Sequence, residues 1–149
     1  MASVVNNPGS SWLIAAAALS GAAALLHLSC IVGGPDWYRF FGAGEGMARA
    51  AARGDLRPTL ITLGIATVLA VWAAYAASGA GLIPRLPLLR TALVAITAIY
   101  LLRALAFVPL HFWRPQHSDA FAIWSSAIVL VYGIVHLVGL VRAWRHLAP

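Results

Sequence analysis

Lysine is missing from this chain, and acidic residues are scarce. All ten basic residues are Arg, Asp and Glu together number four, and charged residues make up 9% of the 149 positions. Hydrophobic residues make up 62%, whereas a soluble domain has about 45–50% hydrophobic and about 25% charged residues. So few polar side chains could not cover a soluble fold of this length. The composition therefore predicts one integral membrane domain over residues 1–149.

Other scarcities exclude further classes of protein. The lone cysteine, Cys30, cannot form an internal disulfide. No Lys or Arg precedes the first apolar run, so the basic start of a cleaved signal peptide is missing. The net charge of +6 is spread beside apolar runs, whereas a nucleic-acid binder gathers its charge on a soluble face. Contact with anionic lipid headgroups explains the arginines more simply, and we expect no nucleic-acid partner.

Four apolar runs predict the fold. A helix needs about 20 residues to cross about 30 Å of hydrocarbon. The third run has only twelve uncharged residues between Arg90 and Arg103, or about 18 Å of helix. The apolar pattern continues past Arg103, which places this arginine inside the membrane. We predict an all-α, integral membrane four-helix bundle with helices at about 11–33, 58–78, 88–110 and 120–142.

The connection at 34–57 is more than a linker. It begins with an aromatic cluster of Trp37, Tyr38, Phe40 and Phe41, residue types that gather at membrane–water interfaces. Further on, Glu45, Arg49 and Arg53 recur every four residues and therefore share one helical face. This pattern predicts a short interfacial helix between the first and second spans.

Polar residues inside the spans predict a binding site. Counted from the helix ends, His27 and Arg103 lie at one depth, about 10 Å below the side of the first and third loops. Ionisable residues inside membranes are costly and usually functional. Arg103 would take Glu45 or Asp36 as its partner. The expected ligand-binding set is His27, Arg103, Tyr100, Trp37, Glu45, Asp36 and Ser125. The alternative is that Arg103 extends to the headgroups and His27 only bonds a neighbouring carbonyl.

A second polar strip lies on the fourth span, where Ser125, Tyr132, His136 and Gly139 share a face. Hydrogen bonding between helices is its simplest interpretation. A haem shared by His27 and His136 is excluded, because the two lie near opposite membrane surfaces. Carboxylate and thiolate ligands at metal-binding spacing are missing as well. We therefore expect no cofactor, no metal and no catalytic residue.

The segments at 37–45 and 86–90 carry a resemblance. Through them the chain resembles a class of small four-helix proteins of the bacterial inner membrane. The resemblance implies a multi-pass fold in that membrane and no activity. Five arginines on the side of the first and third loops, against four on the other side, favour a cytoplasmic position for those loops.

Three functions follow from these features. The leading hypothesis is a non-enzymatic module that binds an amphipathic or lipid-like ligand, or a larger membrane partner. A small homodimeric transporter or channel is the first alternative. The second is a membrane-embedded enzyme that uses His27 as a base. Lipids or lipophilic small molecules are the expected partners, with a homo-oligomer also open.

Overall fold

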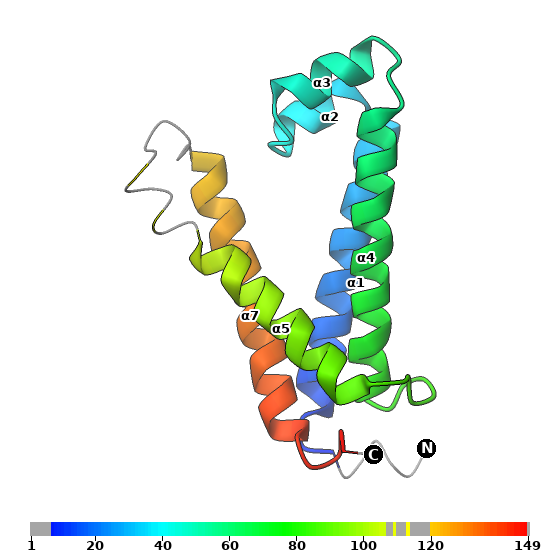
Figure 1. Cartoon of the computed structure of the whole chain (residues 1–149), viewed down its shortest axis with the longest axis vertical. Coiled ribbons are helices and arrows are strands. Elements are labelled where there is room, and N and C mark those ends of the chain that lie inside the picture. The colour runs from blue at the N-terminus through cyan, green and yellow to red at the C-terminus, as the bar shows by residue number, and fades with distance from the viewer. Residues whose placement is uncertain (1–6, 107–108, 110–112, 114–119, 149) are drawn as a thin grey trace. The chain divides into compact units, whose positions relative to one another are not determined.

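The computed structural model of the chain describes residues 7–106, 109, 113 and 120–148. Every element in this part is a helix, as Figure 1 shows. Their order is α1 (Ser10–Gly33), α2 (Pro35–Phe40), α3 (Glu45–Ala52), α4 (Arg57–Gly79), α5 (Leu89–Leu105) and α7 (Ala120–Ala143).

Three of these helices are long and apolar enough to cross a membrane: α1, α4 and the Phe121–Ala143 stretch of α7. Their ends lie within one residue of the predicted ends. At most 22% of each apolar stretch is buried inside the chain, so most of the apolar surface of these helices faces outward. A bilayer would cover that surface without cost.

The third predicted span differs from the structure. α5 has 17 residues, about 26 Å of helix, and it ends two residues past Arg103. Leu88, expected inside the helix, instead precedes it with φ of 53°, a left-handed conformation that breaks the helix. The expected continuation to 110 runs into positions 107, 108 and 110, which lie outside the described residues. The charge at Arg103 thus falls in the last turn of α5.

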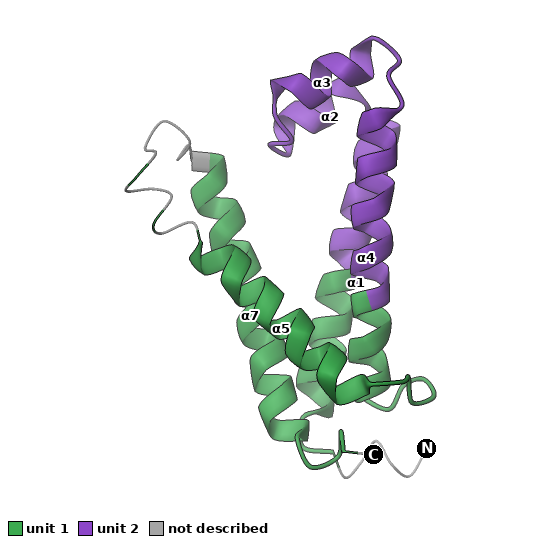
Figure 2. Cartoon of the chain, in the orientation of Figure 1, with its two compact units in different colours: residues 1–20, 72–149 green, residues 21–71 purple. Residues whose placement is uncertain are grey.

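The chain divides into two compact units, coloured separately in Figure 2. Unit 1 comprises Met1–Ser20 and Trp72–Pro149, and unit 2 comprises Gly21–Val71. Both boundaries fall inside helices, so α1 and α4 each contribute one part to either unit.

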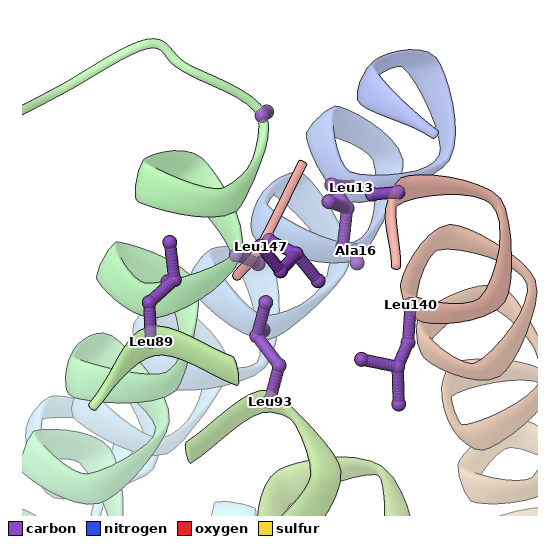
Figure 3. Close-up of a cluster of buried hydrophobic side chains, with 9 residues drawn as sticks. Leu13, Ala16, Leu89, Leu93, Leu140 and Leu147 are labelled. Atoms are coloured by element: carbon purple, nitrogen blue, oxygen red, sulfur yellow. The ribbon is translucent and has the colours of Figure 1, made fainter. Parts of the chain in front are cut away.

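The core of unit 1 draws on four helices. Figure 3 shows Leu13 and Ala16 of α1 with Leu93 of α5 and Leu140 of α7. Ala76 of α4 and Leu147, beyond α7, complete the cluster with Ala80, Leu89 and Ala143. Small residues let the helices approach closely.

Unit 2 contains two short helices where the sequence predicted one. Gly34 and Gly44 precede α2 and α3 with φ of 69° and 92°, conformations that glycine adopts without strain. Each glycine therefore turns the chain sharply into the next helix. The missed helix, α2, begins with Pro35, whose fixed φ suits a first helical position.

The α2–α3 pair is held by a small buried cluster. Tyr38 of α2 packs with Ala48 of α3 and Cys30 of α1, and each of these side chains is buried. The Thr62 hydroxyl of α4 donates a 3.3 Å hydrogen bond to the Tyr38 hydroxyl. Residues from four helices thus fix the orientation of the pair within unit 2.

Candidate functional site

The seven predicted ligand-binding residues divide between the two units. His27, Asp36, Trp37 and Glu45 belong to unit 2, whereas Tyr100, Arg103 and Ser125 belong to unit 1. A single pocket shared by all seven therefore stays a prediction. The geometry of each group within its own unit is clear.

His27 hydrogen-bonds within its own helix. Its Nδ1 lies 2.7 Å from the carbonyl oxygen of Ala23, and the side chain is half-buried. A carbonyl only accepts, so Nδ1 carries the proton and donates it. The alternative that the sequence left open, a bond to a neighbouring carbonyl, describes this residue. Ala24 and Ser20, about one and two turns before His27 in α1, are both buried.

Arg103 is exposed, and its place in the ligand-binding set stays a prediction. The buried stripe of α5 includes Ile96, Tyr100 and Ala104, at the spacing of three to four residues that one helical face requires. Arg103 lies about 60° around the helix from Tyr100, at about 100° per residue, at the edge of the stripe. Ser125 is half-buried, while its neighbour Ser126 is buried.

The two acids expected to pair with Arg103 have arginine partners inside unit 2. Arg39 Nη1 lies 2.9 Å from Asp36 Oδ1, and Arg39 Nε lies 3.0 Å from Glu45 Oε2. Arg49 Nε lies 3.2 Å from the other oxygen of Glu45. The hydrogen bond from Arg39 lowers the pKa of Glu45 below its ordinary value. Asp36 pairs with Arg39 because the two residues are close in sequence and lie one turn apart on α2.

The aromatic residues of α2 point in different directions. Tyr38 is buried, whereas Phe40 is 76% exposed and Trp37 42% exposed. A Cβ atom at Gly33 would lie 2.1 Å from the Trp37 ring, so only glycine at position 33 leaves room for this ring. Trp37 and Phe40 each contact Phe41, with ring centroids 5.7 and 5.0 Å apart. The α2–α3 pair thus presents aromatic side chains outward beside its ion pairs.

Unit 1 contains a buried polar and aromatic cluster around Tyr100. The Tyr100 hydroxyl lies 3.0 Å from Ser20 Oγ, between α5 and α1. The Tyr100 ring centroid lies 4.9 Å from that of Trp72, 5.7 Å from that of Tyr132 and 4.9 Å from that of His136. Such tilted and edge-on ring contacts stabilise packing beyond simple burial. Tyr100, a predicted site residue, is therefore the centre of the packing between four helices.

His136 is the least satisfied member of this cluster. Its Nδ1 donates to the Tyr132 carbonyl oxygen at 2.8 Å. Its Nε2 is buried and has no hydrogen-bond partner among the described residues. The predicted bond between helices is thus replaced by a bond within α7. A buried polar atom left in this way costs about 1–3 kcal/mol.

A basic end of unit 1 was missed as a site by the sequence reasoning. The guanidinium of Arg90 lies 3.4 Å from the Trp144 ring centroid, and that of Arg142 lies 5.8 Å from the Trp12 ring centroid. Beside them a groove of about 530 Å³ is lined by Pro8, residues 140–142 and residues 144–146. The signal available in the sequence was the grouping of Arg142, Trp144 and Arg145.

No metal site emerges from the part of the chain that the structure describes, where no group of three His, Cys, Asp or Glu side chains is close enough to hold an ion. Comparison with known proteins brought no relationship, since no family model, curated protein or solved structure matches the chain.

Proposed function

We propose that this chain is a multi-pass protein of the bacterial inner membrane that binds an amphipathic, lipid-like ligand without transforming it. Three helices with outward-facing apolar surface support the membrane location. In this proposal α5 completes a four-helix bundle. Arg103, exposed in the last turn of α5, extends its guanidinium to the headgroup region, as long cationic side chains do near helix ends.

The observation that carries the proposal is that the α2–α3 pair has both exposed aromatic side chains and ion pairs. Trp37 and Phe40 offer exposed aromatic surface, and Arg39, Glu45 and Arg49 form a network of ion pairs on the same two helices. An amphiphile needs apolar contact for its tail and polar contact for its head. Aromatic and charged residues combined in short helices are also typical of elements lying on a membrane surface.

Within this proposal the four predicted residues of unit 2 have distinct roles. Trp37 contacts the apolar part of the ligand, and Asp36 and Glu45 hold Arg39 in place for its polar part. His27 donates its Nδ1 proton within α1, so its Nε2 is left as an acceptor for a ligand hydroxyl.

The test is to identify the lipids and quinones that copurify with the protein in a mild detergent, by mass spectrometry. The variant Trp37→Ala/Phe40→Ala removes exposed aromatic surface, and we expect the bound amphiphile to fall by at least about tenfold, as loss of two buried aromatic contacts would give. The matched control is Leu60→Ala/Ile61→Ala, which removes exposed apolar side chains from α4. Equal occupancy in the two variants would refute the proposal.

A further inference from the structure

The end of unit 1 that carries the last turn of α7 is strongly basic. It gathers Arg85, Arg90, Arg142 and Arg145, and the four acids of the chain are Asp36, Glu45, Asp55 and Asp119. None of these acids belongs to the segments at 78–90 and 139–148 that form this end. Among the described residues, none of these four arginines forms an ion pair, in contrast to the arginines of the α2–α3 pair.

The four arginines differ in their contacts. Arg85 donates to the backbone carbonyls of His146 and Leu147, which fixes the chain after α7. Arg90 stacks on Trp144 at 3.4 Å. The guanidinium of Arg142 makes a longer contact of the same kind, 5.8 Å from the Trp12 ring centroid. Arg142 and Arg145 are exposed and line the groove of about 530 Å³.

The groove joins this charge to an apolar wall. Pro8, Leu140 and Val141 lie beside the two arginines, and Val141 is 64% exposed. Trp12 and Trp144, each under a guanidinium, are of the residue type that settles at the headgroup level of a bilayer. The volume lies within the range of small-molecule sites, about 300–1,000 Å³.

We propose that this groove is a binding site for the headgroup phosphate of an anionic phospholipid. The forked N–H groups of Arg142 and Arg145 would hold the phosphate oxygens, since the guanidinium matches phosphate in a bidentate geometry. The first carbons of the acyl chains would lie along Pro8 and Val141, the exposed apolar residues of the lining. Because a free phosphate would leave that apolar wall wet, the occupant is a lipid.

This site is separate from the one under Proposed function, because it uses unit 1 alone. Its test uses the full chain in a mild detergent with added phosphatidylglycerol or phosphatidylcholine, and native mass spectrometry counts the bound lipid. We expect phosphatidylglycerol to be preferred by on the order of tenfold, because each arginine near an anionic headgroup favours binding several-fold. The variant Arg142→Gln/Arg145→Gln should lose this preference.

The matched control, Arg53→Gln/Arg57→Gln, removes the same charge from exposed positions of unit 2 and should keep the preference. Arg142→Lys/Arg145→Lys keeps the charge without the fork and should bind with intermediate preference, even if the glutamine variant fails to fold. The proposal is overturned if the wild type shows no preference, if both glutamine variants lose it equally, or if inorganic phosphate competes as well as the lipid. Retention of the preference in Trp37→Ala/Phe40→Ala would show that the two sites succeed or fail separately.

Discussion

His136 Nδ1 lies 2.8 Å from the carbonyl oxygen of Tyr132, one turn earlier in α7. The bond determines which nitrogen of the neutral ring carries the proton, because a carbonyl can only accept. The lone pair is therefore on Nε2, the buried atom with no partner among the described residues. One nitrogen of His136 thus bonds within its own helix. The other is an acceptor without a described partner inside the aromatic cluster of unit 1.

The first prediction concerns that acceptor. His136→Leu removes both nitrogens at a similar side-chain volume. The Tyr132 carbonyl can still accept the backbone N–H of position 136, so the substitution leaves no backbone group unpaired. We expect the free energy of unfolding to change by less than about 1 kcal/mol, because the lost bond and the relieved Nε2 atom offset each other. Reversible unfolding in mixed micelles measures this free energy. A loss above about 2 kcal/mol would contradict this balance.

The second prediction concerns the Ser20–Tyr100 hydrogen bond, whose oxygen atoms are 3.0 Å apart between α1 and α5. Ser20→Ala and Tyr100→Phe each remove one hydroxyl and little volume. Bonds of this kind between membrane helices contribute about 0.6 kcal/mol on average and up to about 1.7 kcal/mol. The double variant should therefore cost less than the sum of the single variants by about 0.5–1.5 kcal/mol. Strictly additive losses would mean that the two hydroxyls do not interact.

The positions of the long helices could be predicted from the sequence because their limits are physical. Arg57 and Pro58 mark the start of α4, and a glycine follows its last apolar turns. Charge and chain length decide where a helix can cross hydrocarbon, and both are visible in the sequence. The start of α5 also lies within one residue of its predicted position, but the helix ends at Leu105, short of the expected continuation.

The partners of the polar side chains could not be predicted in the same way. Depth along a helix can be counted, and it placed His27 and Arg103 at one level. The direction in which a side chain faces around the helix, and which of several nearby groups it bonds, depend on packing. Arg103 lies beside the buried stripe of α5, and the His27 Nδ1 bonds the carbonyl oxygen of Ala23 in its own helix. Glu45 likewise pairs with Arg39 and Arg49, the arginines close to it in sequence.

The third prediction is a pH dependence of the α2–α3 pair. The hydrogen bond from Arg39 lowers the pKa of Glu45 from its ordinary value of 4.5. A carboxyl group with a lowered pKa stabilises the fold above its unfolded pKa. That contribution is lost as the pH falls below 4.5 and through the lowered value. The effect on stability should be small, because the pair is exposed.

Carbon-13 NMR of the Glu45 side chain measures this pKa directly. The midpoint should fall below 4.5 in the wild type and return toward 4.5 in Arg39→Gln. Asp55→Asn, which changes an acid outside this network, is the control and should leave the midpoint in place. A wild-type midpoint at or above 4.5 would contradict the ion pair.

The fourth prediction tests the packing of α5 against α7. A Cβ atom at Gly133 would lie 2.7 Å from Leu101 Cδ2, 3.0 Å from Leu101 Cγ and 3.3 Å from the Leu101 backbone nitrogen. Gly133→Ala must therefore shift the leucine and separate the helices slightly. We expect a loss of about 1–3 kcal/mol in the free energy of unfolding, the usual effect of overfilling a packed contact.

Gly64 of α4 supplies the matched control, because a Cβ atom there would meet nothing within 4 Å. Gly64→Ala should be neutral or stabilise by up to about 1 kcal/mol, since alanine is the better helix former. If steric contact causes the difference between the two glycines, adding Leu101→Ala to Gly133→Ala should make the second substitution cost less than it does alone. Equal effects of the two glycine substitutions would mean that α5 and α7 do not approach closely at Gly133. The aromatic cluster around Tyr100, which joins the same two helices, would then lack the support of this close approach.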